Sequence, residues 1–167
     1  ALRILPNYIL AGTYNGIYRS ADEGNTWEWA SSGIGYPSIR AFGAAYSYYF
    51  AGTFGDGIYR TLDEGGWWEP CNNGLGDMHI TCMTDDFWND VVFAGTYDNG
   101  VYRSFNGGDH WEWDNSGISD PRINTLYYDN SYLLAGTVGG GAFRSDNYGS
   151  SWMPINSGLG NPDVRAF

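Results

Sequence analysis

An eight-residue pattern that could supply acid–base chemistry recurs four times along the chain. Each copy has Ser or Thr first, Asp or Asn third, Gly fifth and Trp eighth. A carboxylate beside a hydroxyl can accept or release a proton, so the Asp positions are the first candidates for catalysis. The copies, called the boxes below, contain Ser20, Asp22, Gly24 and Trp27; Thr61, Asp63, Gly65 and Trp68; Ser104, Asn106, Gly108 and Trp111; Ser145, Asn147, Gly149 and Trp152.

The substitution pattern of the boxes favours a structural role over a catalytic one. Asn replaces Asp in two of the four copies, and a catalytic carboxylate would not tolerate that change. A side chain of either type can accept hydrogen bonds from N–H groups of its own turn. Gly permits the positive φ that such a turn needs, and Trp can bury a large apolar area between neighbouring sheets. We therefore predict that the box residues hold turns and that the four Trp side chains lie in the core.

An Arg stands directly before every box. A set of arginines could bind a carboxylate, but these four recur with the same period as the boxes, so they cannot converge on one ligand. We predict that they span neighbouring repeats and pack along their aliphatic stems. They are Arg19, Arg60, Arg103 and Arg144.

The boxes belong to four repeats that cover the chain. The tripeptide "AGT" occurs at 11–13, 51–53, 94–96 and 135–137, so the period is about 42 residues. In each repeat, apolar β-rich runs alternate with glycine-rich hairpin turns such as "NG" and "DNG", and no helical periodicity competes. A period of this length with four strands is typical of a propeller blade. We predict an all-β propeller with repeats 1–37, 38–78, 79–121 and 122–162, each a four-stranded antiparallel blade, in one domain or an excerpt of one; residues 163–167 begin a further strand.

The box pattern S/T-x-D-x-G-x-x-W resembles the Asp-box, or bacterial neuraminidase repeat. The resemblance extends over nearly the whole chain and is similar to the blades of sialidases, xyloglucanases, sortilin and photosystem II assembly factors. It implies the propeller fold, with ligands bound on the face opposite the box turns. It implies no particular activity, because these proteins do unrelated things.

The loops on that opposite face vary from repeat to repeat. They comprise residues 31–38, 72–79, 115–121 and 156–163, with the hairpin tips near 15, 55, 98 and 139. Variation on a fixed frame is how a repeat protein builds an asymmetric site. The alternative is that these are ordinary solvated loop residues. The predicted ligand-binding residues are Tyr36, Asp77, His79, Asp120, Arg122 and Asp163.

One insertion, "TDDFWND" at 84–90, lengthens the first hairpin of the third repeat on the box side. It places Trp88 near Asp85, Asp86 and Asp90. An exposed Trp beside carboxylates can stack on a sugar ring, but it can equally tuck under the blade.

Composition limits the classes of partner that the chain is expected to bind. The net charge of −11 disfavours nucleic acid, and no apolar run approaches the roughly 20 residues of a membrane helix. Cys71 and Cys82 fit neither a zinc site nor a disulfide framework, so we expect buried free thiols. His79 and His110 are too far apart in the repeat frame for an obvious metal pair. We predict no metal and no cofactor.

No unique acid–base pair stands out in the sequence. We therefore predict a non-catalytic binding or interaction module, extracellular or at the cell surface, with a glycan or protein ligand. The alternative is a part of a secreted glycoside hydrolase, sialidase-like or xyloglucanase-like, whose catalytic residues lie partly outside this chain.

Closure of the propeller is the last question that the sequence raises. The final residues "PDVRAF" align with "PSIRAF" at 37–42, and in that frame Ala1 and Leu2 fall on Ala41 and Phe42. The chain could be an excerpt of a larger propeller, or two copies could close one ring of eight blades. A single chain could also close as four blades. We favour the excerpt or the multi-chain ring, because an open arc leaves unpaired surfaces.

Overall fold

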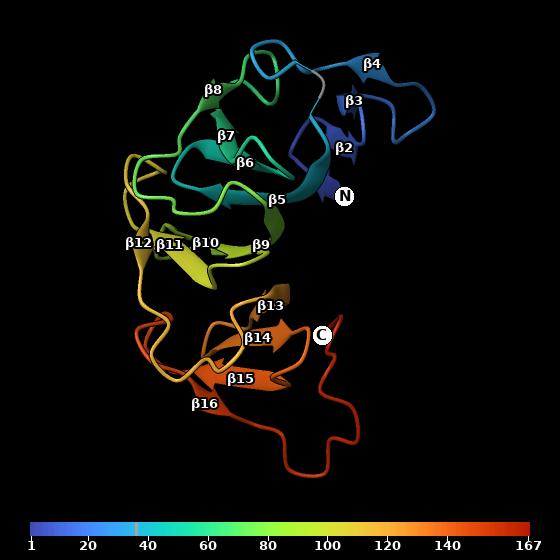
Figure 1. The fold of residues 1–167 in the computed structure, drawn as a ribbon. Helices are drawn as coiled ribbons and strands as arrows, with labels where there is room; N and C mark the ends of the chain where they lie inside the picture. The colour runs from blue at the N-terminus through green and yellow to red at the C-terminus, as the bar shows by residue number, and fades with distance from the viewer. Residues whose placement is uncertain (36) are drawn as a thin grey trace.

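The structure, a computed structural model that describes residues 1–35 and 37–167, is built from short strands, and no described residue lies in a helix (Figure 1). The strands form four separate antiparallel sheets of four strands each, taken in chain order. The predicted all-β propeller fold with four blades is confirmed. Figure 1 shows the blades following one another from the N-terminal blade to the C-terminal blade.

The strands of each blade are short. Blade 1 consists of β1 (Leu2–Ile4), β2 (Ile9–Thr13), β3 (Gly16–Ser20) and β4 (Glu28–Trp29). Blade 2 consists of β5 (Ile39–Ala45), β6 (Tyr48–Thr53), β7 (Ile58–Thr61) and β8 (Glu69–Pro70). Blade 3 consists of β9 (Ile80–Asp86), β10 (Val91–Thr96), β11 (Val101–Ser104) and β12 (Glu112–Trp113). Blade 4 consists of β13 (Ile123–Tyr128), β14 (Leu133–Thr137), β15 (Ala142–Ser145) and β16 (Met153–Pro154).

The AGT tripeptide closes the hairpin between the second and third strands of each blade. In blade 2 the Thr53 hydroxyl donates to the carbonyl of Gly57 at 2.9 Å, and the same bond recurs in the other three blades. Gly57 has a φ of 75°, which only glycine adopts readily. The turn signals of the sequence therefore mark these hairpin tips.

The first strand of blades 2, 3 and 4 carries a shift in its pairing register. Each shift leaves one residue near the start of the strand without a paired partner on the second strand: Arg40, Thr81 and Asn124. A bulge of this kind turns a side chain away from the regular pleat. It therefore determines how these three residues are presented at the end of each blade.

The core lies between consecutive blades. Three apolar clusters join blade 1 to 2, blade 2 to 3 and blade 3 to 4. Box Trp side chains fill them: Trp68, Trp111 and Trp152 are 0%, 1% and 6% exposed. The indole of Trp68 donates to the carbonyl of Ala30, in the blade before, at 2.8 Å. Each of these Trp residues therefore packs against the preceding blade.

The glycine of each AGT tripeptide allows neighbouring blades to approach closely. A Cβ built on Gly52 would lie 2.6 Å from Ile80 Cγ2, and one on Gly95 would lie 2.7 Å from Ile123 Cγ2. Both isoleucines begin the first strand of the following blade. A larger residue in place of these glycines would push the two blades apart.

Trp27 departs from the prediction that all box Trp residues are core. Its side chain is 41% exposed, and its indole donates to the carbonyl of Gly24 in its own turn. Because a box Trp packs on the preceding blade, the Trp of blade 1 has no described residues to cover it.

The two cysteines form no disulfide. Cys71 is buried and Cys82 is half-buried. Burial raises the pKa of each thiol to about 12, so both stay protonated at neutral pH.

Candidate ligand-binding face

The box turns use their polar groups internally. In the first box, Ser20 Oγ donates to Asp22 Oδ1 at 2.7 Å and accepts from the N–H of Gly24 at 2.8 Å. Asp22 Oδ1 also accepts from the N–H of Thr26 at 2.8 Å. Hydrogen bonds from the Thr26 hydroxyl and N–H, and then from Ser20, hold the pKa of Asp22 down at about 2. Such a carboxylate is a turn acceptor that stays ionised.

The Asn copies make the same bonds. Asn106 Oδ1 accepts from the N–H of His110 at 3.1 Å, and Asn147 Oδ1 accepts from the N–H of Ser151 at 2.9 Å. Ser104 Oγ in turn accepts from the N–H of Gly108 at 3.0 Å. Asp and Asn are therefore interchangeable in this turn, because both present an Oδ1 atom that accepts the same hydrogen bond.

Two of the box arginines clamp one blade to the next. Arg60 Nη1 donates to the carbonyl of Gly107 and to Asp109 Oδ1, both at 2.6 Å. Arg103 Nη1 donates to the carbonyl of Tyr148 at 2.8 Å and to Ser150 Oγ at 2.6 Å. These two guanidinium groups reach the box turn of the following blade, as predicted. Arg19 and Arg144 differ from the prediction, because they pair within their own blades, with Glu28 at 2.7 Å and with Asp146 at 3.0 Å.

The opposite end of the blades brings the predicted loops and hairpin tips together. The N–H of Asp98, at the tip of blade 3, donates to Asp77 Oδ2 at 2.9 Å. The N–H groups of Gly100 and Gly141, at two tips, donate to the carbonyls of Pro121 and Pro162 at 2.8 and 3.0 Å. We call this end of the molecule the loop face.

The predicted ligand-binding residues of the loop face form local pairs. Asp77 Oδ1 lies 2.9 Å from both the N–H and the ring Nδ1 of His79. Asp120 is buried and receives two hydrogen bonds from the Arg122 guanidinium, at 2.9 and 2.8 Å. Asp163 is paired in the same way with Arg165, at 2.8 Å.

These bonds set the charge state of the loop carboxylates. Hydrogen bonding from Arg122 lowers the pKa of Asp120. Burial raises the pKa of Asp77, but the hydrogen bonds from the His79 and Asp98 N–H groups outweigh it and lower the pKa overall. Each of these two carboxylates therefore stays ionised. Tyr36, the remaining predicted contact, lies outside the described residues.

Sequence reasoning missed a row of aromatic side chains on the loop face. The residue after AGT is Tyr14, Phe54 or Tyr97 in the first three blades, with side chains that are 74%, 39% and 47% exposed. The ring centroid of Phe54 lies 5.9 Å from that of Tyr97 and 4.8 Å from that of His79. The aromatic column after AGT was readable in the sequence, but the contacts between successive blades were not.

Arg40 joins the first two members of this aromatic row. Its guanidinium carbon lies 5.3 Å from the ring centroid of Tyr14 and 5.1 Å from that of Phe54. The register shift in β5 leaves Arg40 unpaired in the sheet and carries it to the loop face. Arg40 is exposed and makes no ion pair with any described residue, although the chain carries a net charge of −11. It is therefore a cation available to a ligand.

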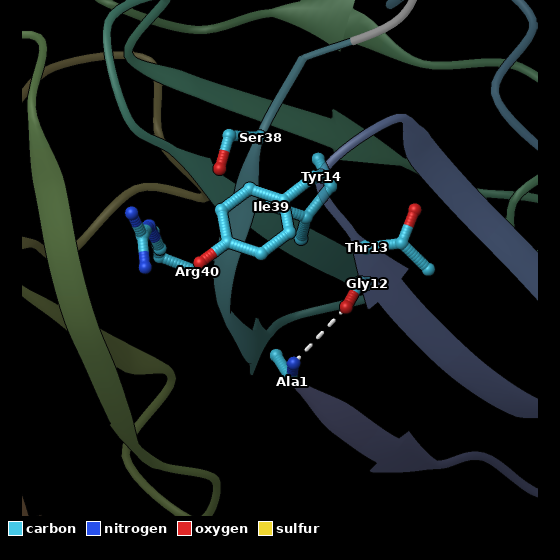
Figure 2. A pocket seen from close by; sticks show the side chains of 7 residues that line it. All are labelled: Ala1, Gly12, Thr13, Tyr14, Ser38, Ile39 and Arg40. Atoms are coloured by element: carbon cyan, nitrogen blue, oxygen red, sulfur yellow. Dashed lines mark hydrogen bonds between the residues drawn. The ribbon is translucent and has the colours of Figure 1, made fainter.

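A pocket of about 240 Å³ opens beside Arg40, as Figure 2 shows. Tyr14, Ser38, Ile39 and Arg40 line it together with the ends of β1 and β2. Ser38 Oγ is buried there and has no hydrogen-bond partner among the described residues. A hydroxyl, a cation and an aromatic ring thus surround one small cavity.

The insertion at 84–90 extends the β9–β10 hairpin and exposes its aromatic tip. Trp88 is 82% exposed and packs edge-on against Phe87, with ring centroids 5.9 Å apart. The neighbouring carboxylates are engaged elsewhere: Asp85 pairs with Arg3 at 2.7 Å, and Asp86 accepts from Asn89 at 2.8 Å. Trp88 therefore does not tuck under the blade. Among the described residues, no group of three or more His, Cys, Asp or Glu could hold a metal ion.

The architecture is that of a β-propeller with four blades. No family model matches its sequence, and no curated protein matches it significantly. The computationally designed Ika8 protein is similar, with a TM-score of 0.72 and 17% identity over 99% of this chain and 51% of Ika8. YCF48 bound to D1 peptide is similar, with a TM-score of 0.66 and 18% identity over 91% of this chain and 51% of YCF48.

A third similar structure is an enzyme. The GH74 xyloglucanase from Xanthomonas campestris has a TM-score of 0.63 and 19% identity over 94% of this chain and 29% of the enzyme. The chain thus spans about half the length of Ika8 and YCF48, and less of the xyloglucanase. At these identities the likeness shows the fold alone.

Proposed function

We propose that this chain is a non-catalytic binding module of the Asp-box type, which takes its ligand across the loop face. The observation that carries the proposal is the continuous row of Tyr14, Arg40, Phe54 and Tyr97, in which exposed aromatic rings flank a cation that has no acidic partner among the described residues. The solved YCF48 structure with a bound peptide supports a binding role for this fold.

The row suits an elongated ligand with flat apolar surfaces. Exposed aromatic rings can stack on sugar rings or on peptide side chains, and each buries a large area for little lost flexibility. The three rings stand on three successive blades, so they present contacts at the spacing of the blades. We propose a glycan or an extended peptide as the ligand.

Arg40 and Ser38 indicate which polar group the ligand carries. A guanidinium binds a carboxylate with two parallel hydrogen bonds, and the buried Ser38 hydroxyl lacks a partner among the described residues. The ligand therefore carries a carboxylate near one end, either on a uronic acid or at a peptide C-terminus. His79, held by Asp77, extends the contact surface, and Asp120, Arg122 and Asp163 stay predicted contacts at its far side.

Binding is tested by titrating the isotope-labelled chain in NMR with defined probes. The probes are a xyloglucan oligosaccharide, an oligogalacturonide, and a short Tyr-rich peptide with a free or amidated C-terminus. We expect shifts at Tyr14, Phe54 and Tyr97, and an affinity for the carboxylate-bearing probe that falls about tenfold, or about 1.4 kcal/mol, in Arg40→Ala. Tyr14→Ala should weaken binding to a similar extent.

The matched control is Trp88→Ala, which removes an exposed aromatic side chain from the opposite end of the molecule. It should leave the affinity unchanged. Weakening by Trp88→Ala with none by Tyr14→Ala would place the ligand on the box side and contradict the proposal.

A second function is favoured by the likeness to the GH74 xyloglucanase. In it, the chain forms part of a secreted glycoside hydrolase whose catalytic residues lie partly outside these 167 residues. Release of reducing sugar from xyloglucan by a longer form, and not by this chain, would favour it. An extracellular location belongs to both proposals, and fractionation of the producing cells tests it. Among the described residues, no helix is long and apolar enough to cross a membrane.

A further inference from the structure

His79 lies on the loop face, and a neighbouring carboxylate determines which of its ring nitrogens carries the proton. Its Nδ1 lies 2.9 Å from Asp77 Oδ1. The ionised Asp77 carboxylate can only accept a hydrogen bond, so Nδ1 of the neutral imidazole carries the proton. The other ring nitrogen, Nε2, is therefore a hydrogen-bond acceptor. No residue that the structure describes donates to Nε2, and the His79 side chain is 48% exposed.

This acceptor borders an exposed aromatic ring that also has a cation beside it. The imidazole of His79 packs edge-on against Phe54, with ring centroids 4.8 Å apart. The guanidinium carbon of Arg40 lies 5.1 Å from the centroid of the same Phe54 ring. A uronic acid residue matches this set of groups, because one sugar ring carries a carboxylate for the guanidinium, hydroxyls for the acceptor and an apolar face for the phenyl ring.

The part of the loop face beyond Phe54 has the opposite charge. Asp77 is ionised, and Asp98 carries its carboxylate on the exposed hairpin tip of blade 3. The guanidinium of Arg122 already donates to Asp120 at 2.9 and 2.8 Å. A second anionic group would meet like charges here, which is unfavourable. Tyr97, which is 47% exposed, offers a ring on which a neutral sugar can stack.

The main chain beside the aromatic row is already hydrogen-bonded within the protein. The N–H groups of Phe54 and Tyr97 donate to the carbonyls of Ser38 and His79, both at 2.9 Å. An extended peptide that adds to a sheet edge needs such main-chain groups to be unpaired. Recognition at this row therefore falls to side chains, which favours a sugar over a peptide strand.

We propose that the loop face binds an oligosaccharide with one uronic acid residue beside Arg40 and Phe54 and with neutral sugars toward Tyr97. This inference rests on the proposed binding function and names its ligand class. Arg40 binds the carboxylate, and Nε2 of His79 accepts a hydrogen bond from a sugar hydroxyl. Asp77 is a positioning residue, because it holds the proton of His79 on Nδ1.

The positioning role is tested on the free chain. Long-range ¹H–¹⁵N NMR at about pH 8.5, above the range in which histidine titrates, reports which ring nitrogen carries the proton. We expect the Nδ1–H tautomer at His79, with His110 of the same chain as the internal reference. Asp77→Asn should lose this preference, because an amide can donate to Nδ1. An Nε2–H tautomer at His79 of the parent chain overturns the proposal.

The ligand class is tested by titration with three trisaccharides of different charge. They are aldotriouronic acid, with one glucuronic acid on two xylose residues, neutral xylotriose, and trigalacturonic acid. We expect aldotriouronic acid to bind about tenfold more tightly than xylotriose, and Arg40→Ala to abolish that difference. Trigalacturonic acid should bind more weakly than aldotriouronic acid, and added salt should narrow the gap because it screens the loop carboxylates.

Two variants of one residue isolate the acceptor. His79→Phe keeps a ring beside Phe54 but removes Nε2, so it should weaken the binding of aldotriouronic acid by about five- to tenfold. His79→Gln retains an acceptor and should lose less. Equal affinities of His79→Phe and the parent chain overturn the role of His79.

The probes also separate this inference from the binding function on which it rests. Tighter binding of trigalacturonic acid, or of the Tyr-rich peptide with a free C-terminus, overturns the assignment of the ligand and leaves the binding function intact. Absence of NMR shifts at Phe54 and Tyr97 with every probe overturns the binding function itself.

Discussion

Trp68 and Trp27 occupy the same position of the same box, yet their surroundings differ. Trp68 is fully buried and bonds to the carbonyl of Ala30 in the preceding blade, whereas Trp27 is 41% exposed and bonds within its own turn. The box therefore fixes where the indole stands. Whether that indole is buried, and so contributes to stability, depends on the neighbouring blade.

The difference extends to the rest of the interface. Ile39, at the start of blade 2, packs over Gly12, and Ile80 and Ile123 repeat the contact in the following blades. Contacts between neighbouring blades therefore stabilise this molecule, as expected for a repeat architecture in which each unit contacts its neighbours. Interior and terminal copies of one residue should respond differently to the same substitution.

The largest expected difference concerns the box Trp residues. Trp68→Ala should lower the free energy of unfolding by about 3–5 kcal/mol, because it leaves a large cavity between blades 1 and 2. Trp27→Ala should lower it by less than about 1 kcal/mol, because the side chain is already partly solvated. Urea unfolding of both variants beside the parent chain measures the two losses. Equal losses would show that Trp27 is covered in solution.

A smaller difference is expected at the AGT glycines. Gly52→Ala should cost about 1–3 kcal/mol, because the added methyl group meets Ile80 Cγ2 at 2.6 Å and both blades must shift. Gly136→Ala should cost a similar amount, because its added methyl group meets Thr125 Cγ2 of its own blade and Val164 Cγ1, both at 2.7 Å.

The matched control for the glycine variants is Gly160→Ala, where a methyl group would meet nothing within 4 Å. It should stay within about 0.5 kcal/mol of the parent chain. Thermal or urea unfolding in which Gly52→Ala costs no more than Gly160→Ala would contradict the role given to blade-to-blade contact.

Much of the fold could be predicted because every structural signal occurs four times. Strand runs, hairpin glycines and boxes recur at the same positions in all four repeats. A chance match in one repeat therefore does not change the prediction. The exposure of Trp27 was missed because a box looks identical whether or not a blade precedes it.

The candidate site was predicted less completely. The variable loop residues were visible as a column, but Asp120 and Arg122 lie in a pair whose geometry only the folded loop shows. Arg40 was missed because its position depends on a register shift between β5 and β6, and pairing register is a property of two strands together. Its lack of an acidic partner likewise depends on which carboxylates the fold brings near.

The smallest expected effect is that of Asp22→Asn, which removes the charge of the first box but keeps its hydrogen-bond acceptor. Asp22→Asn should cost little at neutral pH, because Asn106 and Asn147 accept the same hydrogen bonds in their own turns. Asp and Asn respond differently to acid, because only the Asp carboxylate can bind a proton. Asp22 has a pKa of about 2 in the folded chain, against 3.8 for an unperturbed Asp, so above pH 4 both folded and unfolded chains carry the carboxylate and its stabilisation is fully present.

As the pH falls from about 4 to about 2, the unfolded chain binds the proton first, so the contribution of Asp22 to folding is lost across that window. The Asn variant has no proton to bind at this position. The difference in unfolding free energy between the parent chain and Asp22→Asn should therefore shrink or change sign between pH 5 and pH 2.5, measured by urea unfolding at each pH. Subtracting the variant removes the contributions of the other acidic residues, several of which also have lowered pKa values. A difference that stays constant across this range would mean that the hydrogen bonds of the first box do not depend on its charge.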